Sequence, residues 1–150
     1  MKEYTFNLSD RFDAIRFCDN GGTWTGEIAP SLLDRVLDFA EIDSPFTATL
    51  RGARNEHSQR AIELTSHGQL TLMCERCARD FLYQIDTYSK LWFATDEAEI
   101  DSIESTISEE DDVVLASEVV SAIQLLEDEV LLAIPYSPRC EKVDCEVVKI

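Results

Sequence analysis

Four cysteines are spaced as two pairs that could share one metal ion. Cys74 and Cys77 form a C-x2-C pair, and Cys140 and Cys145 form a C-x4-C pair much further along the chain. Two thiolates on a tight turn can converge on a tetrahedral ion, and four complete a closed structural site. Because ribbon-type sites separate their pairs by only about 15 to 20 residues, tertiary structure must bring these pairs together. We predict a structural zinc site at Cys74, Cys77, Cys140 and Cys145.

Basic residues lie within or beside both cysteine pairs. Four thiolates around a divalent ion carry net negative charge, which favours nearby cations or backbone donors. The candidates for this role are Arg76, Arg79, Arg139 and Lys142. Their position supports the predicted metal site, although turns are commonly basic in any case.

The cysteines also allow other interpretations. Their odd number, five, and the absence of an export signal argue against a disulfide framework. A C-x2-C pair can exchange disulfides when its first thiol begins a helix, but strand-like sequence lies on both sides of this pair and Glu75 disfavours a neighbouring thiolate. Unrelated reduced thiols are the remaining alternative. Cys18 belongs to neither pair, and we expect it to be a small buried hydrophobic residue at a strand end.

The elements that must position these thiols are mostly strands. Alternation of apolar and polar residues and β-branched content predict strands at about residues 3–8, 23–28, 45–54, 60–65, 70–74 and 81–93. The last two flank the Cys74–Cys77 turn as a hairpin. The expected fold class is therefore α+β, with a mainly antiparallel sheet in a meander or partly open barrel, one or two packed helices and a cysteine knuckle.

Two helices and one mobile segment complete the expected organisation of a single domain, 1–150. Pro30 opens a helical pattern of apolar residues that continues to Ala40, and a second helix runs from about Ala116 or Ser117 to Ala133, before Pro135. Residues at about 95–115 are acidic and poor in large apolar groups, so we expect them to form a mobile segment.

The charge is strongly acidic and unevenly distributed. The formal net charge is −17, and thirteen acids but no basic residue occur between Lys90 and Arg139. Such a field repels bare nucleic acid and favours a basic partner, although charge runs often only keep a protein soluble. The candidate partner-binding acids are Glu109, Glu110, Asp111, Asp112, Glu127, Asp128 and Glu129. Direct binding of RNA through Arg51, Arg54 and Arg60 would require these side chains to share a face.

The sequence contains no assembled active site. It has no phosphate-binding glycine loop, no nucleophile elbow and no H-E-x-x-H, and three consecutive acids at 127–129 on a helix point in different directions. No apolar run reaches the roughly 18 to 20 residues that span a bilayer, so no membrane association and a cytoplasmic location are expected. The enzymatic alternatives are a thiol–disulfide oxidoreductase and a metal-dependent RNA-processing enzyme.

One composite pattern is similar to a known family. Leu70–Cys77, the segment Glu127–Cys140 and then Cys145 together resemble the YceD-like family of large ribosomal RNA subunit accumulation proteins. The resemblance implies a non-enzymatic ribosome-biogenesis factor, needed for accumulation of 23S ribosomal RNA and often encoded beside a small large-subunit ribosomal protein. Members often have His where Cys140 stands, an exchange that preserves a zinc ligand. With the acidic charge, we expect binding of a basic large-subunit ribosomal protein or a pre-ribosomal particle.

Overall fold

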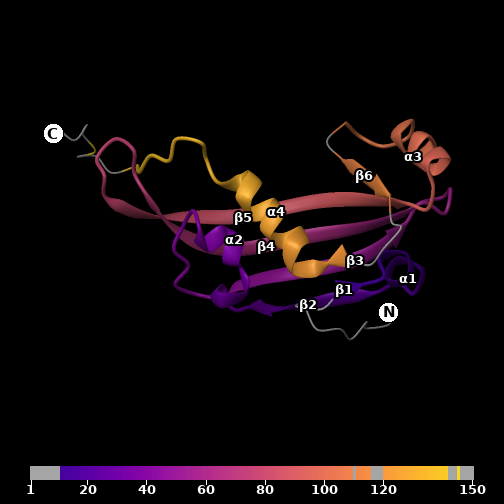
Figure 1. Ribbon diagram of the computed structural model, residues 1–150, viewed down its shortest axis with the longest axis horizontal. Helices are drawn as coiled ribbons and strands as arrows, with labels where there is room; N and C mark the ends of the chain where they lie inside the picture. The colour runs from indigo at the N-terminus through magenta and orange to yellow at the C-terminus, as the bar shows by residue number, and fades with distance from the viewer. Residues whose placement is uncertain (1–10, 110, 116–119, 142–144, 146–150) are drawn as a thin grey trace.

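A five-stranded sheet forms the centre of the molecule. The computed structural model describes residues 11–109, 111–115, 120–141 and 145. The strand order is β2-β3-β4-β5-β6 (Figure 1). The strands are β2 (Thr23–Ile28), β3 (Phe46–Arg54), β4 (Arg60–Met73), β5 (Asp80–Ala94) and β6 (Asp112–Leu115). Strands β2 to β5 are antiparallel neighbours, whereas β6 runs parallel to β5. The predicted α+β class is confirmed, in the form of an open meander.

Three helices cover one face of this sheet. They are α1 (Ala14–Asp19), α2 (Asp34–Leu37), which follows the 3-10 turn η1 (Pro30–Leu32), and α4 (Ala122–Ala133). A short antiparallel pair, β1 (Arg11–Phe12) with β7 (Val120–Ser121), joins the chain just before α1 to the chain just before α4. Helix α4 crosses the sheet diagonally, and the chain beyond it reaches the tip of the β4–β5 hairpin (Figure 1).

The main core lies between the sheet and these helices. Alternate residues of β3, β4 and β5 point into it, as the period of two in a strand requires. Its fully buried large side chains include Phe17, Phe46, Phe93, Leu50, Leu70 and Leu126. Burying large apolar side chains contributes about 1.5 to 3 kcal/mol each, so this core positions α4 on the sheet.

The acidic segment at about 95–115, for which we expect mobility, contains regular structure. Helix α3 (Glu97–Glu104) lies there, against the opposite face of the sheet, and is followed by β6. Ile103 is wholly buried with Trp92 and Ala61. The Asp96 side chain accepts a hydrogen bond from the Glu99 N–H (2.8 Å) and caps the helix. A few isoleucines and one cap therefore support a helix in an otherwise polar stretch.

Strand β4 is continuous where the sequence predicts two strands. It runs for 14 residues through Gly68, which lies opposite Ile85 in β5. A Cβ on Gly68 would lie 2.6 Å from the Phe46 ring. This glycine therefore allows close approach of a buried ring and does not mark a turn.

Other predicted boundaries differ in detail. Leu33 leaves the helical region (φ −102°, ψ 56°) and divides the predicted helix after Pro30 into η1 and α2. Helix α4 begins at Ala122, where the Ser121 side chain accepts a hydrogen bond from the Gln124 N–H. The predicted strand 3–8 and the predicted helix start at 116–117 lie outside the described residues.

Gly52 provides a test of the packing between α1 and the sheet. A Cβ at this position would lie 2.9 Å from the Cys18 Cα and 3.0 Å from the Phe17 carbonyl oxygen. Because backbone atoms cannot move aside as a side-chain end can, Gly52→Ala should lower the free energy of unfolding by about 1 to 3 kcal/mol in urea titration. The exposed Thr47→Ala change on the same strand should remain within about 0.5 kcal/mol of wild type. Equal effects of the two changes would contradict this packing.

Candidate metal centre

The β4–β5 hairpin positions the first cysteine pair. The ladder of the two strands ends at Met73 and Asp80, and the chain between them forms a tight turn. The Cys74 N–H donates to the Arg79 carbonyl (2.9 Å), and the Ala78 N–H donates to the Cys74 carbonyl (2.9 Å). Ala78 has φ 58°, in the left-handed region that costs an L-residue about 1 to 2 kcal/mol. The turn therefore retains a strained residue where glycine would be unstrained, which indicates that other contacts stabilise it.

The segment after α4 supplies those contacts. The helix ends before Pro135, and the chain returns to the hairpin tip (Figure 1). The Glu75 N–H donates to the Pro138 carbonyl (2.8 Å), and the Ser137 hydroxyl donates to the Glu75 carboxylate (2.6 Å). Two residues of the tail are thus bound directly to the second residue of the turn.

The four predicted cysteine sulfurs come together at this junction. All four lie within 4.8 Å of one another. The Sγ atoms of Cys74 and Cys145 are 3.6 Å apart, as are those of Cys77 and Cys140. A tetrahedral site with metal–sulfur bonds of about 2.3 Å would place its sulfurs about 3.8 Å apart. The four side chains therefore have the number, donor type and spacing to hold one metal ion.

Two thiols of the cluster have pKa values shifted in opposite directions, Cys74 downward and Cys145 upward. Burial raises the pKa of Cys74, but hydrogen bonds from the backbone of Cys140, Cys77 and Arg76 outweigh it and bring this pKa to about 5. Burial and the three neighbouring thiols raise the pKa of Cys145 to about 12. Sulfurs this close repel one another as thiolates, so protons must stay among them unless a cation is present.

The surroundings of the sulfurs provide donors of the kind that a thiolate site needs. The Cys140 N–H points at the Cys74 Sγ (3.4 Å). A hydrogen bond from the Arg79 side chain lowers the pKa of Cys77. Arg76 and Arg139 are exposed, and Lys142 lies outside the described residues. Of the basic residues near the two pairs, Arg76 contacts a sulfur through its backbone, and Arg79 through its side chain.

Cys18 is separate from the cluster. It lies in α1 and not at a strand end, is buried, and its Sγ donates to the Ala61 carbonyl (3.1 Å). Burial raises the pKa of this thiol to about 11. Cys18 is thus a protonated, hydrogen-bonded core residue.

Glu127, which the sequence groups with the partner-binding acids, is buried within the fold. Its carboxylate accepts hydrogen bonds from the Arg35 backbone N–H (2.7 Å) and the Arg35 Nε (3.4 Å). The same guanidinium also donates to the Asp128 carboxylate (2.8 Å) and the Gln124 carbonyl (3.0 Å). Arg35 therefore joins α2 to α4, a role that sequence spacing does not reveal because the residues lie far apart in the chain.

The other predicted acids lie around β6 and α4. Glu109 and Asp112 are exposed, and the Asp111 carboxylate accepts a hydrogen bond from the Trp92 indole (3.2 Å). Burial, together with the charges of Asp112 and Asp128, raises the pKa of Glu129. Glu110 lies outside the described residues. The acids on β6 and α4 thus lie close enough to influence one another.

The three arginines considered for RNA binding do not form one free basic face. Arg54 and Arg60 lie opposite each other on β3 and β4, and both bind the Asp19 carboxylate (3.5 and 2.6 Å). Arg51 is three residues from Arg54 in the same strand and therefore points to the other face. The structure thus gives no support to this interpretation.

Comparison with known families gives a match, and it covers the part of the chain that contains the four clustered cysteines. The model of the family described as large ribosomal RNA subunit accumulation protein YceD matches residues 62–150. The chain belongs to the YceD family. The matched part of this YceD-family chain contains the four clustered cysteines, α4 and the acidic segment. The family name refers to accumulation of large-subunit ribosomal RNA and not to a catalysed reaction.

Two further comparisons add no relative, because no curated protein and no solved structure gives a significant match to the chain. Among the helices of the described residues, none has the length and apolar character needed to cross a membrane.

Proposed function

We propose that the chain is a non-enzymatic cytoplasmic factor that supports accumulation of 23S ribosomal RNA by binding a basic large-subunit ribosomal protein or a pre-ribosomal particle. The observation that carries this proposal is the match of the YceD family model to residues 62–150. The net charge of −17 favours a basic protein over bare RNA as the direct contact. In this account the protein acts by occupying or protecting a basic surface during assembly.

The acids proposed to contact the partner lie in two neighbouring places. Glu109, Asp111 and Asp112 lie at and before β6, whereas Asp128 and Glu129 belong to α4. Glu127 takes part indirectly, since its bond to Arg35 holds α4 in place. Exposed charges of this kind act over about 8 Å at physiological ionic strength, so the interaction should weaken with salt.

We further propose that Cys74, Cys77, Cys140 and Cys145 bind structural zinc. Four thiolates in tetrahedral arrangement suit zinc and leave no open coordination position for substrate. The ion would supply the positive charge that allows all four thiols to ionise together. Its role would be to hold the tail against the hairpin.

The enzymatic alternatives find less support. A redox pair needs an accessible thiolate, but Cys74 is wholly buried. In the described part of the chain, the four cysteines are the one group of at least three Cys, His, Asp or Glu side chains that could share an ion. A carboxylate site of the kind that metal-dependent nucleases use is therefore not observed among these residues.

Elemental analysis tests the proposed zinc site. The purified chain should contain about one zinc ion, and Cys140→Ala should lose most of it because three ligands and water bind more weakly than four protein ligands. The matched variant Cys140→His should retain the ion, because imidazole replaces thiolate in sites with three cysteines and one histidine. Cys18→Ala, outside the cluster, should also retain it. Zinc content unaffected by Cys140→Ala would contradict the assignment.

Affinity purification from cells tests the proposed binding function. The tagged chain, washed at low and then moderate salt, should recover a basic large-subunit ribosomal protein or a precursor particle, identified by mass spectrometry and RNA sequencing. Recovery should fall several-fold with the salt increase, as expected for exposed charges. A carboxylate-neutralised variant, Asp112→Asn with Glu129→Gln, should recover less. If neither ribosomal proteins nor precursor RNA are enriched at low salt, the proposed function is wrong.

A further inference from the structure

The outer edge of β5 pairs with another described strand over only part of its length. Strand β6 pairs with Leu91–Ala94, and β4 occupies the other side of β5 along its whole length. In the described part of the chain, no strand pairs with the outer edge of β5 between Asp80 and Lys90. Alternate backbone N–H and C=O groups of such an edge point away from the sheet and can bind another extended chain.

A hollow of about 890 Å³ lies beside residues 88–90 of this edge, between β5, β6 and α4. Its apolar lining includes residues from the sheet and from α4, among them Leu64, Leu91, Leu125 and Leu131. Tyr88 and Leu132, which also line it, are 62% and 82% exposed. Large apolar groups left open beside an unpaired strand are a feature of surfaces that bind partners.

The rim of this hollow is acidic. Asp111 and Asp112 contribute from the β6 side, and Asp128 and Glu129 contribute from α4, with Lys90 as the one basic residue of the lining. Arg35 already binds Asp128, but no ion pair is described for Asp112 or Glu129. Burial and the charges of Asp112 and Asp128 disfavour ionisation of Glu129, so an incoming cation would relieve this repulsion.

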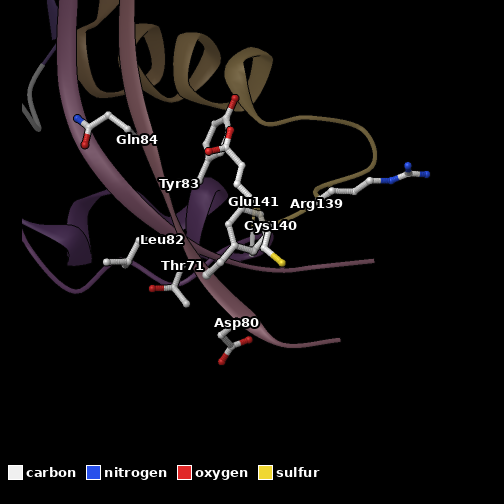
Figure 2. Close-up of a pocket in the computed structure, with 9 residues that line it drawn as sticks. Thr71, Asp80, Leu82, Tyr83, Gln84, Arg139, Cys140 and Glu141 are labelled. Atoms are coloured by element: carbon white, nitrogen blue, oxygen red, sulfur yellow. The ribbon is translucent and has the colours of Figure 1, made fainter. Parts of the chain in front are cut away.

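A second hollow, of about 840 Å³, lies at the other end of the open edge. It lies between β5 residues 80–84 and the tail residues Arg139–Glu141, beside the metal centre. Figure 2 shows the Tyr83 side chain on one side of the β5 ribbon and Leu82 and Gln84 on the other, as strand alternation requires. The open edge therefore has a hollow at each end.

We propose that the open edge of β5 binds an extended, lysine- or arginine-rich peptide segment of a partner protein, which adds as a strand beside residues 80–90. Strand addition takes affinity from backbone hydrogen bonds and specificity from side-chain pockets. Here the hollow under α4 accepts apolar side chains of the segment, and the acids of its rim pair with basic ones. This rests on the proposed function, because it assigns the basic partner to one surface.

Peptide binding tests this surface directly. A fluorescent peptide of about ten residues that alternates valine and lysine matches the length and chemistry of the edge. A control peptide has the same sequence with alternate backbone nitrogens methylated, which preserves charge but removes donors. Fluorescence anisotropy should show binding of the first peptide to the full chain and about tenfold weaker binding of the second. In hydrogen exchange, alternate amides within residues 80–90 should become protected when the first peptide binds.

Paired protein variants separate this site from the general acidity of the chain. Asp112→Asn with Glu129→Gln should weaken binding about tenfold. The control, Glu97→Gln with Asp101→Asn on α3, removes the same charge from the opposite face and should change binding less than about twofold. All four changes preserve side-chain size, so folding should be unaffected.

Several results would overturn the assignment of this edge. The first two are no binding of the unmethylated peptide, and binding of the methylated peptide as tight as that of the unmethylated one. The other two are an equal loss of peptide binding in both double variants, and binding of a single-stranded RNA oligonucleotide at this edge that is tighter than binding of the peptide. If any of these occurs while affinity purification still recovers ribosomal components, the partner binds elsewhere and the proposed function stands. If purification fails but the peptide binds the edge, the surface is correct and the ribosomal role is wrong.

Discussion

Convergence of four sulfur atoms at the tip of the β4–β5 hairpin determines where the final described segment lies. All four lie within 4.8 Å of one another, although they come from two segments far apart in the sequence. Beyond α4 the tail has little to bury, and Tyr136 is wholly exposed. Its position therefore depends on the sulfur cluster and on the hydrogen bonds of Pro138 and Ser137 to Glu75. Because closely spaced thiolates repel one another, a bound cation is the simplest means of stabilising this junction.

The position of α4 links the cluster to the acidic surface. The helix is fixed on one side by buried residues such as Leu126 and on the other by the bonds between Glu127 and Arg35. The next acids, Asp128 and Glu129, line the hollow beside β5. A buried acid thus holds the helix in place, while its neighbours in sequence line the surface proposed for binding. The residues of one short acidic run therefore have separate physical roles.

Local sequence patterns predict much of the sheet and the identity of the clustered cysteines. Alternation predicts the hairpin around Cys74 and Cys77, because a half-buried strand has a period of two. Local patterns do not predict features that depend on residues far away in the chain. From sequence alone Gly68 is typical of a loop, but in the structure it lies within β4, where its lack of a side chain makes room for the Phe46 ring. The burial of Glu127 depends on Arg35, which is 92 residues away in the chain. The few isoleucines of the acidic segment, such as Ile103, become a core only against Trp92.

X-ray absorption at the zinc edge of the purified full chain tests the central claim most directly. Our account predicts a single shell of four sulfur atoms at about 2.3 Å, with no oxygen or nitrogen ligand. Such a shell requires both cysteine pairs to contribute to the same ion. A mixed shell with two sulfurs and lighter atoms, or a protein without bound metal, would contradict it.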